Sequence, residues 1–215
     1  MAFTIDWIPS RFFHEGKISN EMIIIHHTGS TNGRINSLEG TISWFRPDEW
    51  RDNNQVSAQY IIAREERPII QMVRDWDTAW HAGRSEWIVN GVLRKDLNDR
   101  SIGIELQGDG NLVPYTNFQY EALIWLVKQK MRELNVPIEL IRGHEEISGS
   151  KVDPGQMFDW QRFRQGLTSD SIFIPDNDND DGVTLFEETD DVYIPSGKGR
   201  SFLEKLFDSI FSIFR

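Results

Sequence analysis

The stretch Met22-Ile23-Ile24-Ile25-His26-His27-Thr28-Gly29-Ser30 decides the fold of this 215-residue chain. A run of isoleucines is typical of a β-strand that is buried on both faces. Two histidines, a hydroxyl and a glycine follow the run at once, which predicts that the strand ends there. Side chains at the carboxyl end of such a strand lie where a sheet stops and a cleft begins, so His26 is our first candidate metal ligand.

Strands and helices alternate through the first 167 residues, which predicts one α/β domain with helices on both faces of a sheet. The clearest helix is predicted at 118–134, where Thr116 and Gln119 form a capping box. Two segments, 1–21 and 75–95, are expected to lack regular structure. Further strands are predicted at 55–64, at 68–73 as its hairpin partner, at 101–107 with one face in solvent, and at 138–142, with shorter helices at 37–46 and from 160.

Composition excludes several classes of protein. The formal net charge is −11, the acidic residues are concentrated beyond position 167, and no basic stripe is present, so we do not expect nucleic acid as a partner. The chain has no cysteine, so a transition-metal site would have to use His, Asp or Glu. Residues 1–10 lack the pattern of a secretory signal, so we expect synthesis as a soluble cytoplasmic chain.

Three distant side chains fit the donor set of a hydrolytic zinc site, which uses three protein ligands and leaves one position for water. His26 and His144 each follow a short predicted strand, and Asp153 precedes Pro154-Gly155 in a rigid turn. A simpler interpretation exists for each residue alone. A histidine at a strand end is usually structural, and an aspartate before Pro-Gly usually forms a turn, so the spacing leaves both interpretations open.

Five short motifs occur in the order found in one enzyme family. The chain resembles the zinc-dependent N-acetylmuramoyl-L-alanine amidases, a group that includes phage endolysins, muropeptide-recycling amidases and peptidoglycan recognition proteins. Each motif is weak alone, but together they cover about residues 20–166. The motifs are Ile24-Ile25-His26-His27-Thr28, Ser57-Ala58-Gln59-Tyr60-Ile61-Ile62, Ala79-Trp80-His81-Ala82-Gly83, Asn98-Asp99-Arg100-Ser101-Ile102-Gly103-Ile104-Glu105-Leu106, and Gly143-His144 with Lys151-Val152-Asp153-Pro154-Gly155.

The resemblance implies a central mixed β-sheet flanked by helices, with a zinc ion at its edge and a groove for peptidoglycan. In this chain His26, His144 and Asp153 match the family's metal ligands. The reaction implied is hydrolysis of the amide between the lactyl group of N-acetylmuramic acid and L-alanine. Glu105 matches the catalytic glutamate that acts as general base, and Lys151 matches a lysine that stabilises the oxyanion.

Other residues near these motifs receive less direct assignments. His27 is expected to be structural, because adjacent residues of a strand point to opposite faces. The resemblance places Trp80 and His81 beside the groove as substrate-binding residues, with packed loop aromatics as the alternative. Some phage members carry a tyrosine near the second strand in place of the glutamate. Tyr60 is out of step with that position, which favours the mechanism that uses Glu105.

Residues 168–215 are predicted to be an acidic extension, with a linker at 168–200 and an amphipathic helix at 201–215. Part of the linker approximates a calcium-binding loop through Asn177, Asn179, Asp181 and Glu188, although we favour a solvated acidic linker. The terminal helix has one apolar face, which we expect to dock on the domain or to pair between subunits. Contact of this face with a membrane is the alternative.

Two biological settings suit a cell-wall amidase that is made without a signal. We favour a phage-type endolysin that degrades the cell wall once released, because a recycling enzyme has no need of the extension. The alternatives are a cytoplasmic muropeptide-recycling amidase and a non-catalytic peptidoglycan-binding module. The full set of ligands and Glu105 argues against the last of these.

Overall fold

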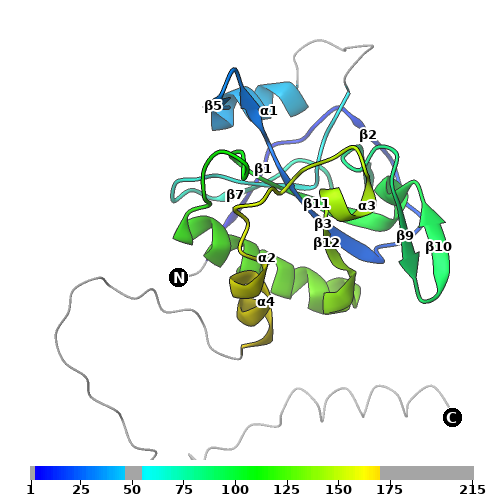
Figure 1. The fold of residues 1–215 in the computed structure, drawn as a ribbon. Helices are drawn as coiled ribbons and strands as arrows, with labels where there is room; N and C mark the ends of the chain where they lie inside the picture. The colour runs from blue at the N-terminus through cyan, green and yellow to red at the C-terminus, as the bar shows by residue number, and fades with distance from the viewer. Residues whose placement is uncertain (1–2, 47–54, 170–215) are drawn as a thin grey trace, which may run out of the picture. The chain divides into compact units, whose positions relative to one another are not determined.

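The computed structural model describes residues 3–46 and 55–169, and a six-stranded sheet lies at the centre of the fold (Figure 1). Neighbouring strands are parallel except for one antiparallel pair, β6 with β7, so the sheet is mixed as predicted. The predicted calcium loop and terminal helix lie outside the described residues. In sheet order the strands are β1 (Ile5–Trp7), β7 (Ile69–Gln71), β6 (Tyr60–Ile62), β11 (Ser101–Leu106), β3 (Met22–His27) and β12 (Ile141–Gly143).

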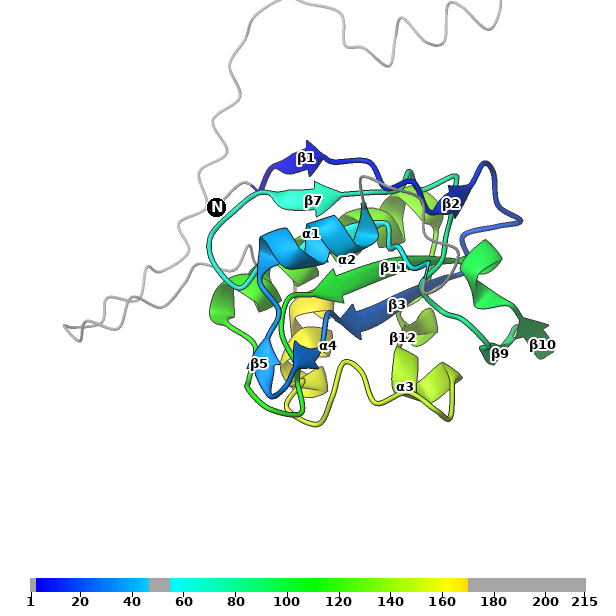
Figure 2. The same ribbon diagram turned by 90° about the horizontal axis from the view of Figure 1, so that it is seen from above.

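Both faces of strand β3 are covered, which confirms the prediction from its isoleucine run. Ile23 and Ile25 pack in the main core with helices α2 (Asn117–Leu134) and α4 (Trp160–Thr168). Ile24 points the other way, into a smaller core with the short helices η1 (Leu97–Arg100) and α3 (His144–Ile147). Figures 1 and 2 show α2 and α4 on one side of the sheet and α1 (Leu38–Phe45) on the other. The alternation of side chains along β3 therefore separates two cores.

Helix α2 follows its predicted boundaries closely. The Thr116 hydroxyl accepts a hydrogen bond from the backbone N–H of Gln119, and the Gln119 side chain accepts one from the N–H of Thr116. At the other end Asn135 takes the left-handed conformation with φ of 55°, which ends the helix. Helix α1 likewise starts after Ser37, whose hydroxyl accepts from the N–H of Gly40.

The two segments expected to lack regular structure contain five strands, so that expectation was wrong. In the first segment, β1 forms an edge of the main sheet and β2 (Phe13–His14) pairs with β8 (Thr78–Ala79) from the second. The second also holds the hairpin of β9 (Glu86–Val89) and β10 (Val92–Lys95). Asn90 and Gly91 join these strands with φ of 51° and 76°, the positive values that a type I′ turn requires.

Three strand predictions also differ from the structure. All six residues of β11 are buried, so the expected solvent face is absent and its second side faces the candidate site instead. The strand predicted at 55–64 is reduced to β6, and the one at 138–142 begins as the 3-10 helix η2 (Ile138–Leu140) before β12. A small hairpin of β4 (Ser30–Thr31) and β5 (Arg34–Ile35) follows β3. Within 3–46 and 55–169, the helices are too short or too polar to cross a membrane.

Leu126 offers a test of the main core, because its side chain is fully buried on α2. Leu126→Ala removes apolar contacts and leaves a cavity, so it should lower the free energy of unfolding by about 2–5 kcal/mol. Leu112→Ala is the matched control, since Leu112 is 47% exposed and its loss should change stability little. Urea unfolding of the two variants would contradict this packing if their losses of stability were equal.

Candidate metal centre

Three elements bring the predicted ligands to one edge of the sheet. His26 lies near the end of β3, and His144 starts α3 directly after β12. The two strands are parallel, with Gly143 paired to Ile25, so their carboxyl ends reach the same place. Asp153 comes from the loop that follows α3. All three side chains are buried.

The ligand atoms of these residues converge closely. His26 Nδ1 lies 3.0 Å from His144 Nδ1 and 3.0 Å from Asp153 Oδ2, and His144 Nδ1 lies 3.1 Å from the same oxygen. Within the described part of the chain, this is the one cluster of three or more His, Asp or Glu side chains arranged to hold a metal ion. The structure thus brings together the three residues proposed from the sequence.

The chemistry of the cluster fits a divalent cation. His144 Nε2 lies 3.2 Å from the carbonyl oxygen of Ala82, and a carbonyl only accepts, so Nε2 carries the proton and Nδ1 presents a lone pair. Burial alone would raise the pKa of Asp153, but its two imidazole neighbours, His144 and His26, outweigh burial and hold that pKa well below its usual range. Lone pairs and a carboxylate facing each other at this distance repel unless a cation lies among them. Two histidines and one carboxylate are a donor set that zinc accepts.

The loop that carries Asp153 is fixed by contacts on both sides. The Tyr115 hydroxyl donates to the carbonyl oxygen of Pro154 at 2.6 Å. The backbone N–H of Glu145 donates to the carbonyl oxygen of Asp153 at 2.9 Å. A Cβ atom at Gly110 would stand 2.0 Å from the Pro154 carbonyl oxygen, so only glycine permits this close approach. These contacts hold the carboxylate towards the two imidazoles.

Glu105 lies on the same face of the sheet as His26. The two residues are paired in register on β11 and β3, while Ile104 packs on the opposite face in the main core. One carboxylate oxygen of Glu105, Oε2, is buried and has no hydrogen-bond partner among the described residues. Burial first, and then the negative charge of Asp153, raise the pKa of Glu105 to about 8, although Lys151 opposes the shift. An unpaired carboxyl beside a donor cluster is available for proton transfer.

The other predicted residues lie around this centre. His27 points away from the ligand cluster, and its Nδ1 accepts a hydrogen bond from the N–H of Gly110 at 3.1 Å, which agrees with a structural role. Lys151 lines the same cleft. Burial chiefly lowers the pKa of His26 to about 4, and the positive charge of Lys151 contributes to this shift. Trp80 forms part of the cleft wall and stacks on Phe12 with ring centres 6.0 Å apart.

His81 lies deeper than its predicted role in substrate binding suggests. It is 8% exposed, and its Nδ1 stands 3.0 Å from His26 Nε2, on the side of the ring away from the ligand cluster. Burial first, and then the charges of His26 and Lys17, hold the pKa of His81 well below its ordinary value. No local pattern predicts this contact, because 55 residues separate the two histidines. Substrate binding by Trp80 and His81 stays a prediction.

The cleft over the cluster has a volume of about 380 Å³ and is open to solvent on one side. Its walls come from β3, α1, the segment before β6 and the loop at 150–153. Lining residues include all three ligands and Glu105 together with His27, Thr28, Gly29, Trp44, Phe45, Val56, Ser57, Trp80, His81, Ser150, Lys151 and Val152.

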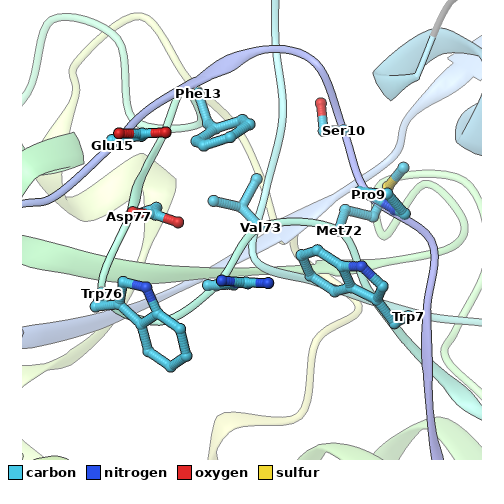
Figure 3. A pocket seen from close by; sticks show the side chains of 10 residues that line it. Trp7, Pro9, Ser10, Phe13, Glu15, Met72, Val73, Trp76 and Asp77 are labelled. Atoms are coloured by element: carbon cyan, nitrogen blue, oxygen red, sulfur yellow. The ribbon is translucent and has the colours of Figure 1, made fainter.

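A second hollow, of about 490 Å³, lies near the β1 edge of the sheet and contains none of the ligands (Figure 3). Its rim carries two exposed indoles, Trp7 and Trp76. The guanidinium of Arg74 stands between them, 5.6 Å from the first ring centre and 5.4 Å from the second. The hollow has no donor cluster of its own, so the smaller cleft is the candidate site.

A mixed α/β sheet with two imidazoles and a carboxylate converging beside a buried glutamate is an arrangement typical of metal-dependent hydrolases. The chain belongs to the N-acetylmuramoyl-L-alanine amidase family, which matches residues 16–156. It is 39% identical over 117 residues to the 1,6-anhydro-N-acetylmuramyl-L-alanine amidase AmpD of Enterobacter cloacae, covering 54% of this chain and 59% of that protein. The match therefore spans somewhat more than half of the relative's length.

Solved structures agree with this assignment. A crystal structure of an AmpD selenomethionine derivative matches with a TM-score of 0.66 and 27% identity, covering 78% of this chain and 97% of that one. The Escherichia coli amidase AmiD, in complex with the substrate anhydro-N-acetylmuramic acid-L-Ala-D-γ-Glu-L-Lys, matches with a TM-score of 0.57 and 28% identity, covering 68% and 57%. The endolysin amidase LysCS of Clostridium intestinale matches at 0.54 with 18% identity, covering 76% and 95%, a likeness of fold alone.

Replacing Asp153 by asparagine tests the metal centre directly. Asp153→Asn keeps the shape of the side chain but removes the negative charge. Loss of a residue that only hydrogen-bonds to a metal ligand lowers affinity roughly 10–100-fold, so loss of this direct ligand charge should lower zinc affinity further than that. Zinc content after dialysis against a weak chelator measures this. Asp6→Asn on the exposed strand β1 is the control. Equal zinc content in the two variants would remove Asp153 from the ligand set.

The raised pKa of Glu105 predicts how stability depends on pH in the metal-free protein. Between the ordinary value of 4.5 and about 8, the folded state keeps a proton that the unfolded state has released. Wild-type stability relative to Glu105→Gln should therefore fall by up to about 1.4 kcal/mol for each pH unit in this window. Urea unfolding at pH 5 and pH 8 measures the difference, with the exposed Glu139→Gln as control. A difference that does not change with pH would contradict the shift.

Proposed function

We propose that this protein hydrolyses the amide bond between the lactyl group of N-acetylmuramic acid and L-alanine, and that its substrates are soluble anhydromuropeptides. The single observation that carries the proposal is the convergence of His26, His144 and Asp153 beside Glu105 in one cleft of this family's fold. The relatives support the substrate class, because AmpD is named for the anhydro sugar and AmiD is seen with an anhydromuropeptide substrate.

His26 Nδ1, His144 Nδ1 and Asp153 Oδ2 would hold the zinc ion. When bound, zinc supplies a water of lowered pKa and polarises the scissile carbonyl. The ligand atoms lie at the floor of an open cleft, so a substrate amide can enter from the solvent side. The adjoining walls carry hydroxyl and indole groups, such as Thr28 and Trp44, that suit a sugar.

Glu105 accepts the proton of the attacking water and delivers it to the amide nitrogen as the peptide leaves. Its carboxyl is suited to this exchange because its buried Oε2 has no competing hydrogen bond among the described residues. Burial raises the pKa of Glu105 in the metal-free site, and the positive charge of a bound dication would favour the ionised form that accepts a proton. Lys151 contributes a positive charge to the cleft, where it stabilises the negative charge that develops on the carbonyl oxygen. The roles of Glu105 and Lys151 form part of the proposal.

The recycling setting has better support than the endolysin setting favoured from the sequence. That preference depended on residues 168–215, which lie outside the described residues from 170 onwards. Identities of 39% and 27% connect the chain to AmpD, whereas the likeness to the endolysin LysCS is one of fold. A non-catalytic binding module has no use for the ligand cluster and for Glu105 together.

Two substrates compared side by side test the proposed function. The zinc-loaded protein should release L-alanine-ended peptide from 1,6-anhydro-N-acetylmuramyl peptides at least about ten times faster, in kcat/KM, than from purified sacculi, because specificity is a ratio of these constants. Liquid chromatography with mass spectrometry identifies the products. Faster release from sacculi would instead support the endolysin setting.

Glu105→Gln separates chemistry from metal binding in the same assay. The variant should keep its zinc and lose about 100-fold or more in kcat, which is typical for removal of a general base. Glu139→Gln, an exposed change, should behave as the wild type. Full turnover by Glu105→Gln would show that another group moves the proton.

A further inference from the structure

The two ligand histidines are each contacted, on the side of the ring away from the ligand cluster, by one of two consecutive residues, His81 and Ala82. His81 Nδ1 lies 3.0 Å from His26 Nε2, and the carbonyl oxygen of Ala82 lies 3.2 Å from His144 Nε2. Ligands from two different elements are therefore held from behind by adjacent residues. Each of these contacts leaves the Nδ1 atom of the ligand facing the cluster.

The proton positions along the contact to His26 follow from a backbone carbonyl. Ser101 Oγ donates its single proton to the carbonyl oxygen of Leu97, which can only accept. Ser101 can then only accept from His81 Nε2, which lies 3.4 Å away, so that nitrogen carries the proton of the neutral ring. His81 Nδ1 is left as an acceptor, and His26 Nε2 must donate to it. The remaining nitrogen of His26, Nδ1, presents its lone pair to the metal.

The residues around His81 leave room for its imidazole ring and fix the backbone that carries it. A Cβ atom at Gly103 would stand 2.5 Å from the ring carbon Cγ of His81, so any larger residue on β11 would displace the imidazole. The side-chain oxygen of Asn98 accepts hydrogen bonds from the backbone N–H groups of both His81, at 3.0 Å, and Ala82, at 2.6 Å. One amide therefore anchors both contacts.

We propose that His81 and Asn98 are positioning residues of the metal centre, which fix the tautomer and orientation of its two ligand histidines. This assigns His81 to the metal rather than to the substrate. The inference rests on the proposed function only in naming zinc as the ion. It concerns metal affinity and proton positions, which can be measured without any substrate.

The first test measures zinc affinity by competition with a chromophoric chelator on the full chain. His81→Ala should lower the affinity about 10–100-fold, as expected for loss of an outer-sphere partner. His81→Asn should recover most of the loss, because its side-chain oxygen can take the place of Nδ1 as acceptor. Arg84→Ala, an exposed change in the same loop, should have no effect. Wild-type affinity in His81→Ala, or the same loss in His81→Asn, would overturn the proposal.

A second measurement does not depend on whether the variants fold. Long-range proton–nitrogen NMR of the metal-free wild type, labelled at histidine, should show protons on Nε2 and not on Nδ1 of both His26 and His144. A proton on Nδ1 of His26 would overturn the proposal.

With cobalt in place of zinc, Asn98→Ala should change the visible absorption spectrum of the site, and an unchanged spectrum would remove Asn98 from the proposed positioning residues.

Kinetics distinguish positioning from substrate binding. If His81 positions the metal, His81→Ala assayed with saturating zinc should lose mainly kcat, because the disturbed group lies on the reaction centre. A raised KM with unchanged kcat and zinc affinity would make His81 a substrate-binding residue instead. Failure of the wild type to hydrolyse anhydromuropeptides would reject the proposed function but would leave the tautomer and affinity results intact.

Discussion

The parallel register of β3 with its two neighbours is the constraint on which the site depends. On one side β11 pairs Glu105 with His26, and on the other β12 pairs Gly143 with Ile25, one residue before His144. Parallel strands end at the same edge of a sheet, so residues 118 positions apart reach one point without any long loop to guide them. A shift of one residue would turn Glu105 into the main core and an isoleucine towards the metal. The apolar packing of β3 and β11 on α2 therefore specifies the chemistry as well as the fold.

How much of this could be predicted from sequence depended on whether the signal was local. The isoleucine run, the capping box of α2 and the helix at 38–45 are patterns within a few residues, and each was confirmed. The hairpin at Asn90-Gly91 also has a strong local signal, although the aromatic residues around it favour an irregular loop. Strand β1 has none, because its three side chains are exposed and only pairing with β7 makes it a strand. The ligand set came from family resemblance, since neither His26 nor Asp153 differs locally from a structural residue.

The site is polar in a place where the surrounding structure is apolar. Glu105 keeps an unpaired buried oxygen, and three electron-rich atoms face one another within 3.1 Å. Such an arrangement disfavours folding on its own, and it persists because the cores on both faces of the sheet determine the backbone independently. Binding of a dication reverses the balance, since the repulsion becomes coordination. A dication bound at this cluster would therefore stabilise the folded domain.

The loop at 80–82 connects the wall of the cleft to the metal ligands. Trp80 faces the cleft, and its backbone N–H donates to the Ser57 hydroxyl at 2.9 Å, while the Ser57 N–H donates to the Trp80 carbonyl at 3.1 Å. His81 and Ala82 follow immediately and contact the far sides of the two ligand imidazoles. The loop is held at one end by Ser57 and at the other by Asn98. The wall of the cleft and the far-side contacts of the two ligand imidazoles therefore belong to three consecutive residues.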